Sequence, residues 1–261
     1  ATFDDLVLPD DLLDELRAIP GWMTTRHRVR VEWGMARGAR AGRGVTCLFA
    51  GPSGTGKTLA AEVVASSLGV DLYVIDLSQI VDKYIGETEK NLDRVFQEAQ
   101  DVNGVLLFDE ADALFSKRTD VKSSHDRNAN LEVAYLLQRM DRYDGVAVLT
   151  TNLRSNIDEA FTRRLDLVCA FTEPDRDARR ALWAQHLPPG VPVAELNLDL
   201  LAEHLNVTGG VIRNITMAAA HAAAIEDSPV TMRHLALAAM REFRKQGRLF
   251  TSTAVSDLVA R

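Results

Sequence analysis

The octapeptide GPSGTGKT at residues 51–58 has the pattern G-x-x-x-x-G-K-T and constrains the possible folds more than any other segment. It follows an apolar run, Val45–Ala50, with the length and the β-branched and aromatic content of a buried strand. The Ala-rich segment Leu59–Leu68 that comes after it favours a helix. A glycine-rich loop between a strand and a helix N-terminus presents backbone N–H groups and a favourable dipole to phosphate groups. The sequence therefore predicts that this chain binds a nucleoside triphosphate.

The side chains of this phosphate loop have separate expected roles. Lys57 can reach the β- and γ-phosphates, and the hydroxyl of Thr58 can bind Mg²⁺. A glycine-rich turn that matches the pattern by chance is the alternative, and the flanking strand and helix argue against it. The residues expected to contact the nucleotide are Gly51, Pro52, Ser53, Gly54, Thr55, Gly56, Lys57, Thr58 and Leu59.

Composition sets broad limits on the class of protein. The 261 residues are enough for one large domain or two unequal ones, and a net charge of −7 gives no bulk reason to bind nucleic acid or an anionic membrane. No run has the length of a membrane span and no signal-peptide pattern opens the chain, so we expect a cytoplasmic protein. The first residue is Ala1, which favours a piece of a longer protein. Cys47 and Cys169 lie in apolar runs and are most simply buried thiols, although two cysteines alone do not exclude a disulfide.

Short apolar runs alternate with helical stretches over the first two thirds of the chain. This alternation predicts a parallel sheet with helices on both faces. The helical stretches are 88–100 and 129–143, and the further strand-like runs are 72–77, 105–108, 146–150 and 167–171.

The character of the sequence changes after Glu173-Pro174-Asp175, where β-branched runs give way to Ala- and Leu-rich segments. The expected helices are 176–187, 198–205, 209–226 and 231–245. We therefore expect a large α/β nucleotide-binding domain over 1–173 and a small helical domain over 174–261.

Two acidic residues end the strand-like run at 105–108. A carboxylate at such a strand tip can hold the Mg²⁺ that bridges the phosphates, which suits Asp109. Glu110, one residue on, can polarise the attacking water as a general base. An Asp-Glu pair alone is usually a solvated turn, but here it follows a buried strand downstream of Lys57.

Asn152 follows the run at 146–150. Because the carboxyl ends of parallel strands converge on the ligand crevice, Asn152 can orient the attacking water or contact the γ-phosphate. A turn or helix-capping Asn is the alternative.

Together these motifs resemble the AAA+ ATPases over nearly the whole chain. The resemblance implies an α/β P-loop NTPase fold, with a parallel five-stranded sheet sandwiched by helices and a small helical lid, that hydrolyses ATP with Mg²⁺. Asn152 matches the position called sensor 1 in that family. The opening segment Thr2–Leu6 looks like the stretch beside the adenine, so Asp5 and Leu6 are expected ATP contacts.

The segment Ile157–Asp166 looks like the region that holds arginine fingers in this family. Such an arginine reaches the γ-phosphate bound by the neighbouring subunit, a contact worth about 10³–10⁵ in rate in related enzymes. Arg163 and Arg164 are adjacent, which departs from the family pattern, and either can be the finger. An Arg-Arg pair taken alone is more often a solvated surface.

The segment Lys83–Leu92 resembles the first pore loop of the family, with Tyr84, Ile85 and Gly86 as its aromatic-hydrophobic-Gly tripeptide. In the family, six such loops line a channel and hold an extended polypeptide by apolar contact and stacking. The alternative is that Tyr84 packs into the core. The polar stretch Ser116–Arg127 is then a second pore-facing loop or simple surface.

Arg213 lies near the start of an expected helix of the small domain, within TGGVIRN. Many AAA+ lids place an arginine here, called sensor 2, that reaches the γ-phosphate. A surface arginine is an equally good interpretation.

A narrower combination of segments resembles the Cdc48-like ATPase modules of bacterial extracellular contractile injection systems. Those segments are KYIGETEKNL, NLEVAYLLQRM, EAFTRRLD, GGVIRN and MREFRKQGR. The resemblance implies a hexameric homo-oligomeric ring that unfolds, threads or remodels a polypeptide in its central pore. The acidic net charge leads us to expect neither nucleic acid nor a membrane as a partner. The alternatives are an assembly scaffold or switch with little turnover and, as a poorer fit to the acidic charge, a nucleic-acid motor.

Overall fold

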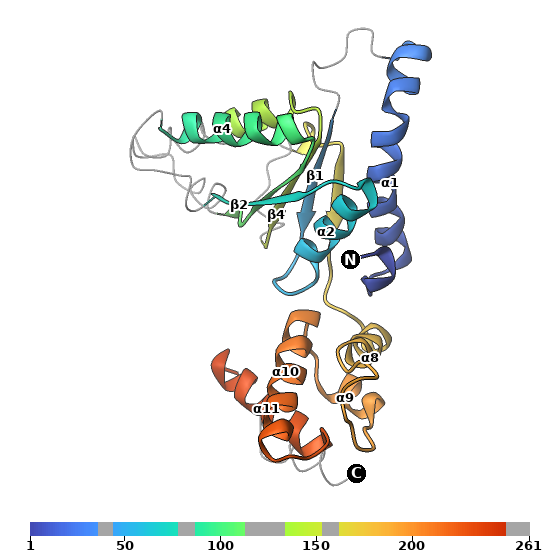
Figure 1. The fold of residues 1–261 in the computed structure, drawn as a ribbon, viewed down its shortest axis with the longest axis vertical. Helices are drawn as coiled ribbons and strands as arrows, with labels where there is room; N and C mark the ends of the chain where they lie inside the picture. Colours follow the sequence, from blue (N-terminus) through green and yellow to red (C-terminus); the bar gives the residue numbers. More distant parts are fainter. Residues whose placement is uncertain (36–43, 78–86, 113–133, 153–161, 249–261) are drawn as a thin grey trace. The chain divides into compact units, whose positions relative to one another are not determined.

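The computed structural model describes residues 1–35, 44–77, 87–112, 134–152 and 162–248. The chain divides into two compact units, one made of Ala1–Pro52 with Lys57–Phe171 and the other of Ser53–Gly56 with Thr172–Arg261 (Figure 1). The domain limits of 1–173 and 174–261 stay a prediction.

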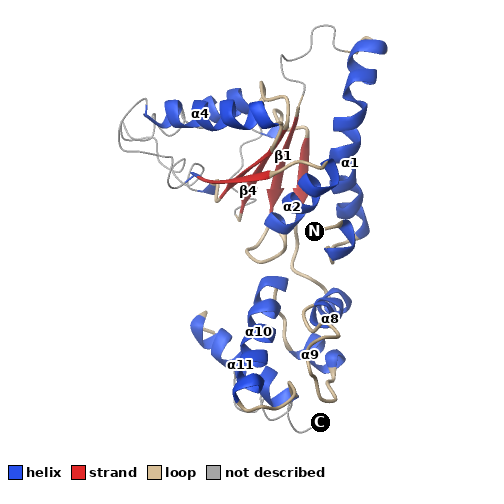
Figure 2. Ribbon diagram, viewed as in Figure 1, coloured by secondary structure: helices blue, strands red, loops and turns tan. Residues whose placement is uncertain are grey.

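The first unit is built on a five-stranded parallel sheet with the order β2-β3-β4-β1-β5. The strands are drawn in red in Figure 2. All five strands begin at the predicted residue and end within one residue of the predicted limit. The strand β1, which leads into the phosphate loop, lies between β4 and β5. The predicted fold class is therefore confirmed. The strands are β1 (Val45–Ala50), β2 (Leu72–Asp76), β3 (Val105–Asp109), β4 (Val146–Thr151) and β5 (Leu167–Ala170).

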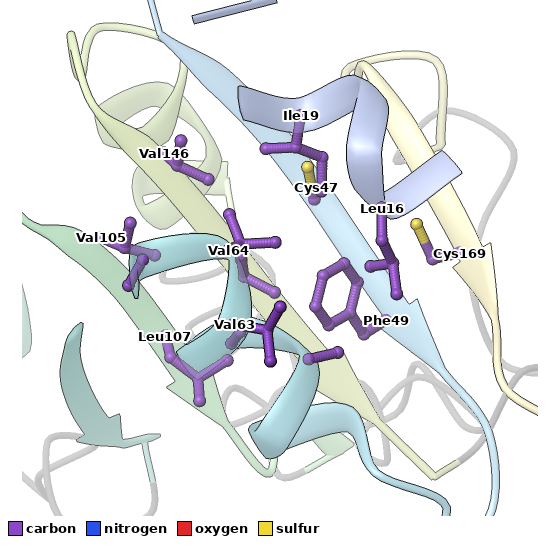
Figure 3. Close-up of a cluster of buried hydrophobic side chains, with 14 of the residues drawn as sticks. Leu16, Ile19, Cys47, Phe49, Val63, Val64, Val105, Leu107, Val146 and Cys169 are labelled. Carbon is purple, nitrogen blue, oxygen red and sulfur yellow. The ribbon is translucent and has the colours of Figure 1, made fainter. Parts of the chain in front are cut away.

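Side chains of the central strands alternate between two apolar clusters, because successive strand residues point to opposite faces. Cys47 and Phe49 of β1 face α1 (Asp10–His27) and α2 (Lys57–Leu68), whose residues pack over them (Figure 3). Leu48 belongs to the other cluster, which includes residues of α4 (Glu87–Val102). The sheet is thus covered on both faces, which is why its central strands read as continuous apolar runs.

The long N-terminal helix α1 was not predicted from the sequence. Pro20 and Gly21 lie inside it, and both residues ordinarily weaken a helix interior. Leu12, Leu16 and Ile19 are buried on one side of α1, so packing against the sheet outweighs the local preference. The helix continues into a single π-helical turn, η2 (Arg28–Glu32). A short 3₁₀ turn, η1 (Phe3–Asp5), precedes α1.

The second unit is helical, as expected. Its core surrounds the fully buried Trp183 and includes residues of all four helices. Asp175 and Asn197 accept hydrogen bonds from the first turns of the helices that they precede, which fixes where α8 and α9 begin. The helices are α8 (Arg176–Gln185), α9 (Leu198–His204), α10 (Gly209–Ile225) and α11 (Met232–Lys245).

Three predicted features need separate comment. The predicted helix over 129–143 lies partly outside the described residues, and its described part is helical at 134–140. Cys47 and Cys169 are buried free thiols. Among the residues that the structure describes, no helix combines the length and the apolar character needed to cross a bilayer.

Candidate nucleotide site

The carboxyl ends of β1, β3 and β4 lie side by side, because β1 and β3 both pair with β4. The loop after β1 is tied to β4 by a hydrogen bond of 3.0 Å from the N–H of Gly51 to the carbonyl of Thr151. The segment after β3 is tied to the same strand by a 3.0 Å bond from the N–H of Ala111 to the carbonyl of Thr150. The phosphate loop, the Asp-Glu pair and Asn152 therefore meet at one edge of the sheet.

The loop needs glycine at two positions for different reasons. A Cβ on Gly51 would lie 2.1 Å from the carbonyl oxygen of Phe171, in the backbone that continues β5. The N–H of Phe171 also donates to the carbonyl of Ala50 at 2.8 Å, so this backbone cannot move aside freely. Gly56 has a φ of +101°, which L-residues rarely adopt.

Lys57 begins α2 and is only 8% exposed. Its ammonium donates to the carbonyl oxygens of Gly51 (2.6 Å) and Pro52 (2.9 Å). It also donates to the side-chain amide oxygen of Asn152 at 2.9 Å. The lysine is therefore held between the phosphate loop and the end of β4.

The charge environment of this lysine has two opposing parts. Burial lowers the pKa of Lys57 from its ordinary value of 10.5, while the nearby carboxylates of Asp109 and Asp112 act to raise it. A desolvated ammonium attracts anions more strongly than a hydrated one, because the local dielectric is low. The arrangement suits the binding of a polyphosphate.

The two acids after β3 differ in their surroundings. Asp109 is half-buried and accepts a hydrogen bond from the hydroxyl of Thr150. The same hydroxyl accepts from the N–H of Glu110 at 3.3 Å. Glu110 is exposed and has a φ of +56°, a left-handed conformation that costs an L-residue about 1–2 kcal/mol. Strain of this kind persists only where the surroundings hold it, which makes Glu110 a candidate for a functional role.

The geometry is that of a nucleotide site, and the comparison with known families agrees. Residues 47–173 match the family described as "ATPase family associated with various cellular activities (AAA)". Residues 47–173 form an AAA-family ATPase domain. The prediction that the chain is an ATPase is confirmed at the level of this domain, which contains the phosphate loop, Asp109, Glu110 and Asn152.

Relatives of the AAA domain are found among several ATPases. ATP-dependent zinc metalloprotease FtsH 2 of Sphaerobacter thermophilus is 32% identical over 232 residues, which are 85% of this chain and 34% of that protein. Proteasome-activating nucleotidase 2 of Haloferax volcanii is 33% identical over 177 residues, 65% of this chain and 43% of that protein. A cell division cycle protein 48 homolog of Archaeoglobus fulgidus is 35% identical over 167 residues, 61% of this chain and 22% of that protein. The chain thus spans less than half the length of each of these relatives.

The residues expected to hold Mg²⁺ in the AAA domain carry the right kind of ligand atom. Thr58 presents an exposed hydroxyl in the first turn of α2, and Asp109 presents a half-buried carboxylate at the end of β3. Mg²⁺ prefers such oxygen ligands and usually completes its shell with substrate phosphates and water. In the described ranges no group of three or more His, Cys, Asp or Glu side chains could hold a metal ion without such help.

Sequence reasoning missed one side chain of the AAA domain site, Asp112. Its carboxylate accepts from the hydroxyl of Thr151 and from the backbone N–H of Asn152, the latter at 3.0 Å to Oδ2. These contacts join the segment after β3 to the end of β4. The sequence carried only a weak signal, an acid two residues after Glu110, because the partners lie about 40 positions further along.

Arg163 and Arg164 lie in the turn that precedes β5 and are exposed. This turn is at the amino-terminal end of β5, where Asp166 bonds through its backbone N–H to the carbonyl of Thr46 at 2.8 Å. Because β1 and β5 are parallel, the phosphate loop and the arginine pair belong to opposite ends of the sheet. The structure does not bring these arginines to the site of the same chain.

The remaining residues that the sequence predicts to contact ATP or substrate keep those roles as predictions. Asp5 accepts from the N–H of Thr2 at 2.7 Å, which caps η1, and Leu6 is buried in the cluster under α1 and α2. Arg213 is exposed on α10 in the second unit, where its charge, after burial, helps to lower the pKa of His186. Tyr84, Ile85 and Gly86, and the stretch Ser116–Arg127, lie outside the described residues.

Proposed function

We propose that this chain is the ATPase module of a Mg-ATP-driven ring motor that unfolds, threads or remodels protein substrates. The observation that carries the proposal is the arrangement at the carboxyl edge of the sheet. There the Lys57 ammonium bonds to Asn152 beside β3, which ends at Asp109 and is followed by Glu110. This combination of a cation, a carboxylate pair and an amide is what hydrolysis of a nucleoside triphosphate needs.

Each side chain has a role that follows from its surroundings. Lys57 binds the β- and γ-phosphates, and its partial burial strengthens the attraction between its charge and theirs. Thr58 and Asp109 would hold Mg²⁺, which supplies charge neutralisation on the phosphates when bound. Glu110 is exposed at the strand tip and can accept a proton from the attacking water, while Asn152 orients that water or the γ-phosphate.

The arginine pair favours an assembly in which one chain completes the site of the next. Arg163 and Arg164 lie in the turn before β5, at the end of the sheet opposite to the phosphate loop. Either of these two arginines could therefore stabilise charge on a transferring phosphoryl group only in a neighbouring copy. We propose a homo-hexameric ring, with Arg163 or Arg164 as the finger.

The proposed substrate is a polypeptide, held by the tripeptide Tyr84-Ile85-Gly86 in the central pore. The names of two relatives, an ATP-dependent metalloprotease and a proteasome-activating nucleotidase, support a role in protein turnover or remodelling. An acidic net charge of −7 disfavours nucleic acid and anionic membranes as partners. A cytoplasmic location and an association with a contractile injection system belong to the same proposal and rest on the sequence alone.

An assembly scaffold with little turnover is the second candidate. It needs nucleotide binding but no general base, so the strained and exposed Glu110 argues against it.

The test measures the ATPase rate per subunit against protein concentration, and nucleotide binding, for the wild type, Lys57→Ala, Glu110→Gln, Arg163→Ala and Arg164→Ala. We expect a steep rise with concentration in the wild type and in one arginine variant, no nucleotide binding in Lys57→Ala, and tight ATP binding without turnover in Glu110→Gln. A rate that is flat with concentration and independent of both arginines contradicts the ring motor. Wild-type turnover in Glu110→Gln removes Glu110 as the base.

A further inference from the structure

Asp112 uses both of its carboxylate oxygens on the end of β4. Oδ1 accepts from the hydroxyl of Thr151, and the backbone N–H of Asn152 lies 3.2 Å from Oδ1 and 3.0 Å from Oδ2. Asp112 itself is half-buried. Hydrogen bonds to an ionised acceptor are stronger than neutral ones, so this contact fixes the backbone at the point where β4 ends.

Asn152 depends on such a contact for its orientation. Its side chain is exposed, so little packing restricts its rotation. What defines its position is the backbone N–H bond to Asp112 and the bond from Lys57 to its amide oxygen (2.9 Å). The three residues form a continuous series from the segment after β3, through the end of β4, to the phosphate loop.

Thr150, the residue before Thr151 in β4, also bonds to the segment after β3. The hydroxyl of Thr150 donates to Asp109 and accepts from the N–H of Glu110, while the carbonyl of Thr150 accepts from the N–H of Ala111. The residues Thr150 and Thr151 thus hold opposite ends of the tetrapeptide 109–112. The proposed base and the proposed water-orienting amide are fixed against each other by this arrangement.

We propose that Asp112 is a positioning residue for the hydrolysis of the nucleotide. It holds the end of β4 so that the Asn152 amide faces Lys57 and the γ-phosphate that Lys57 binds. The inference rests on the proposed function and adds to it a residue that positions Asn152 and does not itself touch the nucleotide. Loss of Asp112 then reduces turnover more than nucleotide binding, because Lys57 and the loop remain in place.

The experiment measures kcat and KM for ATP and the thermal midpoint in the full-length protein. The variants are Asp112→Ala, Asp112→Asn and Thr151→Val, with Asp101→Asn on the exposed end of α4 as the matched control. We expect Asp112→Ala to lower kcat by about tenfold to a hundredfold, as misplacement of a catalytic group does, with KM changed much less. Asp112→Asn keeps one acceptor oxygen and restores part of the rate. Thr151→Val loses one of the contacts of Asp112, so its kcat should lie between those of Asp112→Ala and the wild type. Asp101→Asn should have the kcat of the wild type.

A double-variant comparison distinguishes positioning from a general structural role. In an Asn152→Ala background, Asp112→Ala should lower kcat by less than about twofold, because coupled residues are not additive. If the two reductions multiply, or if Asp112→Ala keeps the wild-type kcat, the proposal is wrong. If Asp112→Ala does not fold, Asp112→Asn and Thr151→Val in the same background decide the question.

A binding readout separates this proposal from the proposed function. If the wild type hydrolyses no ATP at any concentration, the motor proposal fails. The Asp112 proposal is then judged by the ratio of the Kd for ADP to the Kd for a non-hydrolysable ATP analogue. Asp112→Ala should lose the preference for the γ-phosphate to the same degree as Asn152→Ala, and an unchanged preference overturns the proposal.

Discussion

The ammonium of Lys57 donates a 2.9 Å hydrogen bond to the side-chain amide of Asn152, a residue 95 positions further along the chain. The contact joins the loop after β1 to the end of β4. A γ-phosphate that accepts a hydrogen bond from the Lys57 ammonium would therefore either replace the Asn152 amide oxygen as an acceptor or share the ammonium with it. The phosphate loop and the end of β4 are therefore parts of one site.

Asn152→Asp should weaken ATP binding more than ADP binding. The new carboxylate keeps an acceptor for Lys57 but places a negative charge where the γ-phosphate approaches. A pair of like charges about 4 Å apart costs about 1 kcal/mol in water and more near a protein surface, so we expect a loss of about tenfold or more in ATP affinity. Titration with fluorescent ATP and ADP analogues checks this, with Asn152→Ala as the uncharged control. Equal effects on both nucleotides would place Asn152 away from the γ-phosphate.

Glu110→Gly should raise the free energy of unfolding while abolishing hydrolysis. Glu110 has a φ of +56°, and glycine adopts this conformation without strain. The relief of about 1–2 kcal/mol is partly offset by about 0.5–1 kcal/mol for the entropy that glycine loses, which leaves a net gain of up to about 1.5 kcal/mol. Chemical denaturation of Glu110→Gly and Glu110→Gln makes the comparison, because both lose the carboxylate and only the first loses the strain. Equal stabilities of the two variants would show that the conformation carries no cost.

The same Gly→Ala substitution should have opposite effects at two positions. Gly51→Ala places a Cβ 2.1 Å from the carbonyl oxygen of Phe171, and overpacking of this kind costs about 1–3 kcal/mol. Gly21 lies in α1, and beyond the backbone of that helix no atom of the described residues comes within 4 Å of the position that an added methyl group would take. Gly21→Ala should therefore stabilise the protein by about 1 kcal/mol. Thermal unfolding of both variants measures the difference. A tolerated Gly51→Ala, with nucleotide binding intact, would mean that β5 can move away from the loop.

Stability should fall as the pH rises above 9, because two thiols are buried. Burial, followed by the charge and a hydrogen bond of Glu15, raises the pKa of Cys169 from 9.0 to about 12. Burial also raises the pKa of Cys47 well above its ordinary value. When folding raises the pKa of a thiol, its contribution to the free energy of unfolding is fully present below the pKa of the unfolded chain. That contribution is lost as the pH rises through the pKa of the folded protein. Between pH 9 and about 12 the unfolded chain therefore loses protons first, and each thiol reduces stability by up to about 1.4 kcal/mol per pH unit.

The contribution of the thiols can be isolated with Cys47→Ala and Cys169→Ala. Other groups also titrate in this range, so the comparison is between the slopes of stability against pH in the variants and in the wild type. Each alanine variant should show a shallower decline. Parallel curves would indicate that the thiolates reach solvent without unfolding.

The strands were predictable and the helix α1 was not, for opposite physical reasons. A buried parallel strand such as β1 is apolar throughout, so Val45–Ala50 stands out from its surroundings. In α1 only a narrow stripe is buried, and Pro20 followed by Gly21 interrupts the helical signal. Its stability comes from packing, which one segment of sequence does not contain.

The candidate site shows the same division. Lys57, Asp109 and Glu110 belong to local motifs with a strand beside them, so their convergence followed from the rule that carboxyl ends of parallel strands meet. Asp112 had no such motif, because its role depends on Thr151 and Asn152 in another strand. Its hydrogen bonds to these two residues became visible only in the three-dimensional structure.

The position of the arginine turn before β5, at the far end of the sheet from the phosphate loop, has a genetic consequence. If the arginine serves the adjacent copy, a chain damaged at Glu110 still donates a working arginine, and a chain without Arg163 and Arg164 still offers a working carboxylate. If the two inactive variants are mixed in equal amounts, part of the turnover would then return. It would return at each interface where a chain with an intact Glu110 lies next to a chain with intact arginines. Two such alleles would complement each other in one cell. Either allele expressed together with the wild-type allele would lower the activity of the wild-type protein.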